Sequence, residues 1–570
     1  MRILKGIAAA SGIASGKALL FLHTSFNAQK EKIKPSEIEK ELQKLDSAVT
    51  EAVKELDGIT ATLSKGEQLD ILETHKIMLQ DPGYLGEIQD AIRIRNLNAA
   101  WAVESVTASL IATLEASDDA IIIERVADFS DIGQKLLGEL LGKKRPSLGS
   151  LTEDVILVSD QLVPSEMLSM DKKHIKAIAL DTGGRTSHVA IFARSFGIPT
   201  VLGLNSASRK LKNGDHVILD GNTGLFYIRP EWRTDDEYQK KMVDWDKYLT
   251  ELSSVASLPS VSPDGRTYEM KANIETVDEA ALAIKNGANG IGLFRSESLY
   301  LGSKGLPSEE YQFQTYKEVL SAMGGRPVTI RTMDIGGDKA VSGMGVNEEN
   351  PILGWRAVRF CLERKDIFRV QLRALLRASA FGKLHIMFPM ISGIDELERV
   401  LLLFEQVKDE LRNSKIPFDE DLKVGTMIEV PSAALCSDIL AKKVDFFSIG
   451  TNDLIQYTIA VDRGNEKIAY LYQPFHPGVL RLIKMVIDNA HEAGIPIGMC
   501  GEMASDPMAT ILLAGLGLDE FSMSPSSLLE VRRLLRNHTY AEAKKIAEDV
   551  LKLSSSNVIT SYLKNFMNKS

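Results

Sequence analysis

The sequence predicts an α/β protein in which an N-terminal α/β domain carries an inserted helical bundle and precedes a C-terminal (β/α)8 TIM barrel. Three observations predict this fold. The chain has 570 residues, which is too long for a single hydrophobic core. Residues 36–142 show apolar residues at helical spacing and almost no strand signals. The chain beyond residue 265 alternates short apolar runs with helical patterns, as successive β/α units do.

The N-terminal domain is predicted from β-like runs on both sides of the helical stretch. The economical interpretation is an α/β domain of residues 1–24 and 146–230, with a helical subdomain of residues 25–145 inserted into it. The subdomain has about four amphipathic helices, and we expect the Pro82-Gly83 pair to break the helical pattern. The β-like runs occupy residues 16–22, 155–159, 175–181, 216–221 and 225–229.

The barrel is predicted to follow a linker. Residues 231–264 read as a helix and then a hinge, because SLPSVSPDG is rich in proline, serine and glycine. Residues 265–570 then hold eight apolar runs, and their number and the length of about 300 residues favour a closed barrel. A doubly wound open sheet is the alternative. The runs lie at 268–274, 290–294, 327–334, 384–390, 424–430, 445–450, 495–501 and 519–524.

Composition excludes several classes of function. A formal net charge of −10 argues against a sequence-independent nucleic-acid binder, which needs a basic surface. The three cysteines are far apart, which argues against a zinc site or a disulfide framework and favours a reducing compartment. The N-terminus has no signal-peptide core, and no uncharged apolar run reaches 18 residues. The sequence therefore predicts a soluble cytoplasmic protein that does not span a membrane.

Polar residues occur where the predicted barrel strands end, which is where barrel enzymes carry their chemistry. Several of these residues are charged, and a buried charge without a partner is costly. We therefore expect them to meet around one ligand. They are Arg295, Arg331, Glu429, Asn452, Asp453 and Cys500, with Asn273 and Ser522 at the ends of the first and last strands.

The types of these residues indicate the ligand. Glu429 and Asp453 offer the hard oxygen atoms that suit Mg²⁺. Arg295, Arg331 and Arg463 offer planar forks that match phosphate and carboxylate groups. The expected ligand is small, carries more than one anionic group and is chelated by the metal. Two alternatives remain from the residues alone: Arg331 and Glu429 could pair with each other, and Cys500 could be a small buried apolar residue.

His188 is a further candidate site residue. Residues 181–194 read DTGGRTSHVAIFAR and place His188 at the entrance of a predicted amphipathic helix. A helix N-terminus disfavours a protonated imidazole and favours a nearby anion, so a neutral nucleophile and a phosphate are both suited to this position. A surface histidine that decorates the helix is the alternative.

Several motifs together resemble a known family. GGRTSHVAIFAR is similar to the phosphohistidine signature of enzyme I of the bacterial sugar phosphotransferase system, pyruvate phosphate dikinase and phosphoenolpyruvate synthase. ILETHKIMLQD resembles the helical part that docks the carrier protein HPr. Four further segments resemble the phosphoenolpyruvate-binding barrel of the same group: IRTMDIGGDK, MIEVPSA, SIGTNDLIQYTIAVDRGN and GMCGEMASDP. The order of parts resembles the enzyme I family nearly end to end, without the ATP-grasp domain of the two other relatives.

The resemblance implies a two-step phosphoryl transfer with a domain that swivels between two sites. His188 would accept the phosphoryl group from phosphoenolpyruvate and pass it to HPr, with pyruvate as the other product. Mg²⁺ would bind Glu429 and Asp453, and Cys500 would protonate the enolate. Arg295, Arg331, Arg463 and Asn452 would hold the substrate, with Arg356 as a further candidate, and Gly183, Gly184, Thr186, Ser187 and Arg194 would surround the phosphohistidine. A homodimer through the barrel is also expected from the resemblance.

The sequence departs from the family pattern at a few flanking positions. Val163 and Met167 replace two threonines, and Met167 cannot offer a hydroxyl near the active histidine. Ser296, Ser298 and Glu275 also differ from the usual residues. These changes motivate one competing hypothesis, a phosphoacceptor scaffold that has lost turnover. An ATP-using relative of the dikinases is another, which the missing nucleotide domain disfavours.

Overall fold

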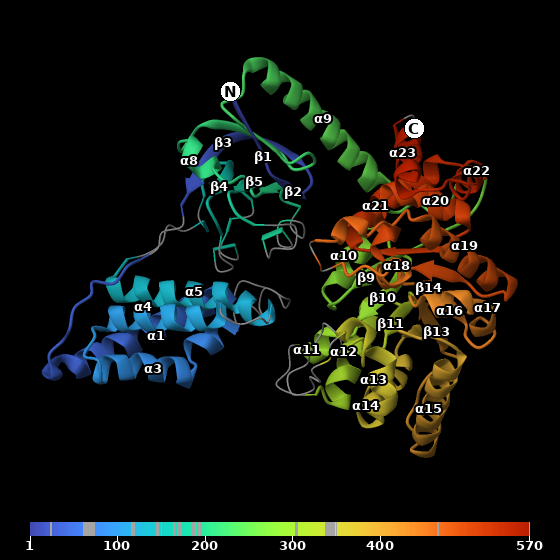
Figure 1. The fold of residues 1–570 in the computed structure, drawn as a ribbon, viewed down its shortest axis with the longest axis horizontal. Coiled ribbons are helices and arrows are strands. Elements are labelled where there is room, and N and C mark those ends of the chain that lie inside the picture. Colours follow the sequence, from blue (N-terminus) through green and yellow to red (C-terminus); the bar gives the residue numbers. More distant parts are fainter. Residues whose placement is uncertain are drawn as a thin grey trace. The chain divides into compact units, whose positions relative to one another are not determined.

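The chain folds into two compact units, Met1–Leu249 and Thr250–Ser570, which are described separately (Figure 1). The computed structural model describes residues 1–22, 26–60, 74–115, 120–143, 148–149, 151–162, 166–167, 170–171, 173–183, 189–190, 193, 197–301, 306–336, 348, 350–463, 465 and 467–568. No helix in these ranges has both the length and the apolar character that a membrane crossing requires.

The first unit is built on an eight-stranded sheet of mixed direction, in the order β1-β8-β7-β3-β4-β5-β6-β2. Neighbours from β3 to β6 are parallel, and the other pairs are antiparallel. All five runs predicted as strands are strands. The bounds are β1 Arg2–Lys5, β2 Ile7–Ala10, β3 Ile13–Phe21, β4 Val155–Ser159, β5 Ile175–Leu180, β6 Thr200–Leu202, β7 His216–Asp220 and β8 Leu225–Ile228.

Two apolar layers cover this sheet. On β4, Val155 and Leu157 belong to a cluster that also contains the bundle residues, whereas Ile156 and Val158 belong to a second cluster. Because side chains alternate along a strand, the two clusters lie on opposite faces. This double burial explains why residues 155–158, VILV, are apolar throughout and do not alternate.

The inserted bundle contains helices α1 Ile38–Thr60, α3 Pro82–Arg93, α4 Ala99–Glu115 and α5 Ala120–Leu141 (Figure 1). The Pro82-Gly83 pair begins α3: Asp81 is the N-cap, and its carboxylate accepts a hydrogen bond from Tyr84 N at 2.8 Å. Proline suits the first helical position because its missing N–H would have no helical partner there. The prediction stated only that this pair breaks the helical pattern. The structure shows that the break is the start of a new helix.

The second unit is a closed barrel of eight parallel strands in the order β10-β11-β12-β13-β14-β15-β16-β9, and the barrel prediction is confirmed. The strands are β9 Glu269–Ile274, β10 Gly290–Arg295, β11 Val328–Arg331, β12 Leu384–Phe388, β13 Lys423–Ile428, β14 Phe446–Ile449, β15 Ile497–Met499 and β16 Glu520–Met523. The main helices around it are α10 Glu279–Lys285, α12 Glu309–Ala322, α13 Ala357–Glu363, α14 Lys365–Ser379, α15 Ile394–Asn413, α16 Pro431–Leu435, α18 Thr451–Ile459, α19 Pro477–Glu492, α20 Pro507–Leu516, α21 Leu528–Asn537, α22 Tyr540–Val550 and α23 Ser556–Met567.

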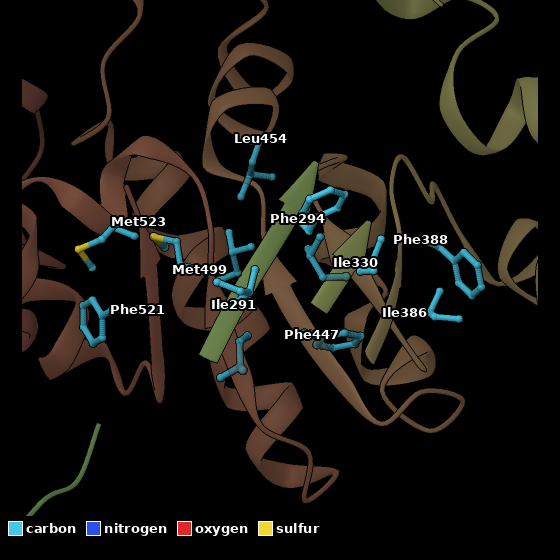
Figure 2. Packing of buried hydrophobic residues seen from close by; sticks show 14 of the residues in the cluster. Ile291, Phe294, Ile330, Ile386, Phe388, Phe447, Leu454, Met499, Phe521 and Met523 are labelled. Carbon is cyan, nitrogen blue, oxygen red and sulfur yellow. The ribbon is translucent and has the colours of Figure 1, made fainter. Parts of the chain in front are cut away.

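The barrel also has two apolar layers. Figure 2 shows the outer one, in which Ile291 and Phe294 on β10 and Ile386 and Phe388 on β12 are buried in the cluster that the strands form with the helices. A smaller cluster is separate and contains Leu293, Met387, Met427 and Cys500. Since Leu293 precedes Phe294 on the same strand, this smaller cluster fills the inside of the barrel.

Charged side chains lie toward the N-terminal ends of the strands. Lys271 on β9 is buried and forms an ion pair with Glu520 on β16, which is partly exposed. The His385 ring on β12 packs on Phe446, with 5.6 Å between ring centroids. Burial, followed by the charge of Lys271, lowers the pKa of His385 to about 4, so this imidazole is neutral at pH 7.

Helix α9 Trp232–Ser254 leads into a segment that is firmly attached to the barrel. Arg532 on α21 is only 1% exposed, and its guanidinium donates to the carbonyl oxygens of Ala256 at 2.6 Å and Gly287 at 2.5 Å. A Cβ at Gly287, where φ is +78°, would lie 1.9 Å from the Ala256 oxygen, so only glycine fits. Arg536 also donates to the carbonyl of Pro259, in the stretch predicted as a hinge.

Candidate active site

A cavity of about 480 Å³ opens at the C-terminal ends of the barrel strands. All seven barrel residues that the sequence predicted as site residues line it, and so does Arg356. These residues are Arg295, Arg331, Glu429, Asn452, Asp453, Arg463 and Cys500. The two other strand-end residues, Asn273 and Ser522, are not part of the lining; Asn273 contacts the backbone of Cys500 and Ser522 contacts Asn273, as described below.

The strands set the positions of the two neighbouring arginines. Arg295 is the last residue of β10 and Arg331 the last residue of β11, and the parallel register pairs them directly. Arg295 shares the inward direction of Leu293 two residues before it, because side chains on a strand alternate. Their side chains differ in exposure: 42% for Arg295 and 7% for Arg331.

Arg331 is held by two buried carboxylates. Its Nη2 donates to Glu297 Oε1 at 3.0 Å, and its Nη1 lies 3.3 Å from Asp334 Oδ2. Burial alone would lower the pKa of Arg331, but the charges of Glu297 and Asp334 raise it above its ordinary value. Arg331 is therefore a fixed cation, and the pairing with Glu429 that the sequence left open is replaced by these two partners.

Arg356, the N-cap residue of α13, is tied to the same network. Its guanidinium donates to both oxygens of Asp334, at 2.8 and 2.9 Å, and lies 3.7 Å from Asp453. Only 4% of its side chain is exposed. Asp334 thus links two arginines, which fixes both cations beneath the cavity.

Glu429 and Asp453 are buried carboxylates that, unlike Glu297 and Asp334, do not form close ion pairs with the arginines described above. Glu429 follows β13, and its Oε1 accepts a hydrogen bond from Met390 N at 2.6 Å. Asp453 lies in the first turn of α18, and its Oδ1 is buried with no hydrogen-bond donor among the residues that the structure describes. Burial and the charge of Asp453 raise the pKa of Glu429 well above its ordinary value. A Cβ at Gly450 would come within 2.8 Å of the Glu429 carboxylate, so a glycine keeps this space open.

These features fit a divalent cation. Two buried acidic groups that repel each other, one with a free oxygen, are stabilised when a cation binds between them. No group of three or more His, Cys, Asp and Glu side chains within the described ranges is arranged to hold a metal ion. A cation on Glu429 and Asp453 would therefore complete its coordination with oxygens from water or from a ligand, which is the usual habit of Mg²⁺.

Cys500 follows β15 and forms the boundary between the cavity and the apolar interior. Its thiol is buried beside Leu293 and Met427, and burial raises its pKa to about 11. The thiol is therefore protonated at neutral pH. Asn273 Nδ2 donates to the Cys500 carbonyl at 2.9 Å, and Ser522 Oγ donates to Asn273 Oδ1 at 2.5 Å. The ends of the first and last strands thus hold the backbone of Cys500.

Asn452 and Arg463 complete the rim. Asn452 Nδ2 donates to Glu502 Oε1 at 3.2 Å, and Glu502 N donates to Asn452 Oδ1 at 3.0 Å. Arg463 N donates to Gln456 Oε1 at 3.1 Å, which fixes the loop that follows α18. The Arg463 side chain is exposed and lines the cavity.

Comparison with known proteins identifies the family. Models of the N-terminal, mobile and PEP-binding domains of PEP-utilising enzymes match residues 5–125, 151–224 and 250–540. The phosphoenolpyruvate-protein phosphotransferase of Priestia megaterium is 41% identical over 566 residues, which cover 99% of this chain and 98% of the relative. Proteins of the same name from Geobacillus stearothermophilus and Staphylococcus carnosus are 43% and 42% identical, with 99% of this chain covered in both cases and 98% and 99% of the relatives.

This chain belongs to the phosphoenolpyruvate-protein phosphotransferase family. The resemblance drawn from the motifs is thus confirmed, and so is the fold class. The cavity lies wholly within residues 250–540, the part that matches the PEP-binding domain of the family. His188 lies within residues 151–224, the part that matches the mobile domain.

Sequence reasoning missed the groups that support Arg331. Glu297 and Asp334 lie within three residues of predicted site arginines. An acidic residue so close to each arginine in the sequence could have indicated an ion pair at the site. Gln371 on α14 donates from Nε2 to Ser296 Oγ at 3.0 Å and accepts from Met333 N at 3.0 Å. Ser296 Oγ in turn donates to the Arg331 carbonyl at 2.8 Å. No local pattern distinguishes Gln371 from other buried residues of its helix.

The phosphohistidine segment is described only in part. His188, Gly184, Thr186, Ser187, Arg194 and Val163 lie outside the described residues. Gly183 is described and has φ of +98°, a conformation that favours glycine. Met167 is 3% exposed and belongs to the apolar cluster of the first unit, so this departure from the family pattern contributes to packing.

Proposed function

We propose that this protein transfers the phosphoryl group of phosphoenolpyruvate to His188, releases pyruvate, and passes the phosphoryl group on to a histidine of the carrier protein HPr. The observation that carries the proposal is the cavity, where fixed arginines lie beside two buried carboxylates whose charges need a cation. This combination suits a small ligand with several anionic groups and a chelated metal. Phosphoenolpyruvate carries a phosphate and a carboxylate close together, and so has this chemistry.

In the proposed complex, Arg295 and Arg463 contact the substrate from the exposed rim, and Arg331 contacts it from the buried side. Asn452 contributes its amide. Mg²⁺ would be held by Glu429 and Asp453, and when bound it neutralises charge on the substrate oxygens. Fixed cations around the phosphate favour transfer because they stabilise charge without reorganising.

The proposed chemical step begins when His188 Nε2 attacks phosphorus in line with the bond to the enol oxygen. The phosphorus–oxygen bond breaks, and the electron pair leaves with the enolate of pyruvate. The enolate carbon then takes a proton from the Cys500 thiol, which is protonated at neutral pH. Solvent reprotonates the thiolate after pyruvate leaves.

The remaining steps follow from the resemblance. A swivelling movement of the His188 domain would carry the phosphoryl group to HPr on the helical subdomain, and barrels from two chains would form a homodimer. The transfer would be the first step of sugar uptake by a cytoplasmic phosphotransferase system, with no role for nucleic acid or membrane in the reaction itself.

A labelling experiment tests the proposal. Incubation of the full chain with phosphoenolpyruvate labelled in the phosphate should give an acid-labile, alkali-stable protein adduct that requires Mg²⁺. His188→Ala should abolish the label, whereas His216→Ala, a change at an exposed histidine of the same unit, should leave it intact. Label that survives His188→Ala would contradict the assignment.

A further inference from the structure

One arginine of the rim differs from the others in its partner. Arg331 and Arg356 pair with the carboxylates of Glu297 and Asp334, and both members of each pair are buried. Arg295 instead pairs with Glu275, a carboxylate that is itself 53% exposed and lines the cavity. The Arg295 guanidinium, whose side chain is 42% exposed, is thus already bound to an anion of the protein.

The fold places Glu275 in this position. Ile274, the last residue of β9, is paired in register with Phe294 on β10, so the next residues, Glu275 and Arg295, emerge side by side at the rim. The backbone of Glu275 is fixed as well: its N–H donates to Glu279 Oε2 at 2.7 Å, and its carbonyl accepts from Ser298 Oγ at 3.2 Å. The carboxylate therefore has a fixed origin within reach of Arg295.

An anionic ligand must compete with this carboxylate. When a phosphate or carboxylate group binds Arg295, Glu275 loses its partner and remains close to a second anion. Both effects weaken binding, because an exposed ion pair is lost and two like charges approach. Removal of the Glu275 charge abolishes both effects, whereas it leaves Arg331, Arg356 and the two metal-binding carboxylates in place.

We propose that Glu275 is an affinity-setting residue, which competes with the anionic substrate for Arg295 and raises the substrate concentration that the protein requires. The inference rests on the proposed function, because it takes phosphoenolpyruvate as the ligand. Glu275 acts on binding and touches neither the phosphoryl group in transfer nor the enolate carbon. Its charge should therefore change the concentration dependence of the reaction and leave the maximal rate unchanged.

The test is Glu275→Gln in the full chain, with Glu269→Gln as the matched control. Glu269 is an exposed residue at the opposite end of the same strand, so the control removes the same charge away from the cavity. We expect Glu275→Gln to lower the phosphoenolpyruvate concentration for half-maximal labelling by about three- to tenfold, with the maximal rate within about twofold. The control should change neither quantity.

Two further measurements isolate the electrostatic cause. The gain in phosphoenolpyruvate affinity caused by Glu275→Gln should become smaller as ionic strength rises, because salt screens exposed charges. A gain caused by a change in local structure would not depend on ionic strength in this way. Calorimetric titration of phosphoenolpyruvate with Mg²⁺ into His188→Ala protein should show the same gain in affinity when Glu275→Gln is added, without turnover.

These outcomes separate the inference from the proposed function. If His188→Ala protein still takes up label, or if no phosphoenolpyruvate binds, the proposed function fails. If the wild-type protein is labelled at His188 but Glu275→Gln leaves the half-maximal concentration unchanged or raises it, the function stands and the role of Glu275 is overturned.

Discussion

Buried charge lies at both ends of the barrel, but the two ends balance it differently. At the N-terminal end, Lys271 pairs with the carboxylate of Glu520, and the neighbouring His385 is neutral at pH 7. At the C-terminal end, six carboxylates and four guanidinium groups of the described part of the chain line one cavity. Glu429 and Asp453 lie there with an Asp453 oxygen that has no hydrogen-bond donor in that part. The same barrel thus contains a closed ion pair, in which each charge has a partner within the protein, and an open set of charges, in which some groups need a ligand as their partner.

The difference teaches how to distinguish a structural charge from a functional one. A closed pair satisfies its own charges, so removal of one member leaves the other buried and unpaired, which destabilises the fold. The carboxylates of Glu429 and Asp453 are neutralised only when a cation binds between them. Removal of one of these charges should therefore relieve repulsion in the free protein and weaken ligand binding. The two ends should therefore respond in opposite ways to the same substitution.

The largest effect is expected for Glu429→Gln at the open end. The amide keeps an oxygen that can accept the hydrogen bond from Met390 N, but it loses the charge that a cation needs. The labelling rate with phosphoenolpyruvate and Mg²⁺ should fall by at least about 100-fold. The free energy of unfolding of the barrel should stay the same or rise, because repulsion with Asp453 is removed.

Unfolding of the barrel can be followed by fluorescence of Trp355, the one tryptophan after residue 250, once Trp101, Trp232 and Trp245 are replaced by Phe. If urea denaturation showed Glu429→Gln to be strongly destabilised, Glu429 would belong with the closed pair and the comparison would fail.

An intermediate effect is expected for Glu520→Gln at the closed end. The change leaves the Lys271 ammonium buried without its partner, so the barrel should lose about 3 kcal/mol of stability by the same Trp355 measurement. The labelling rate of the folded protein should change less than about twofold, because the pair is remote from the rim. Lost activity at full stability would contradict the distinction between the two ends.

The smallest effect concerns pH. The folded protein holds the pKa of His385 at about 4, whereas an unfolded histidine titrates near its ordinary value of about 6.5. Between these values the unfolded chain binds more protons, so stability is full above about pH 6.5 and falls as the pH drops toward 4. From pH 7 to pH 5 the barrel should lose about 2 kcal/mol through this histidine, and His385→Asn should remove that part of the loss. Equal losses in the two proteins would assign the pH sensitivity to other groups.

The sequence predicted the barrel and its rim well, because both depend on local patterns. Each apolar run became a strand, and the polar residue at its end, such as Arg295 or Cys500, came to the cavity because parallel strands end on one side. Strands β1, β2 and β6 of the first unit were missed, since each has only three or four residues and none shows a clear period.

Other features could not be predicted because they depend on contacts between distant segments. Gln371 holds the Ser296 hydroxyl and the Met333 N–H from a helix, and nothing in its own neighbourhood of sequence indicates this role. The pairing of Glu275 with Arg295 depends on the register between β9 and β10. A one-residue slip would separate the two side chains, and register is not visible in a single strand.

The contacts of Arg532 determine where the barrel can be cut from the rest of the chain. A fragment that begins at residue 265, after the proline-rich stretch, would lack the Val255 and Ala256 carbonyls and the Ser260 hydroxyl to which this guanidinium donates. A buried cation would then lack acceptors in the truncated protein. A barrel intended for separate expression should therefore start within α9, ahead of Val255.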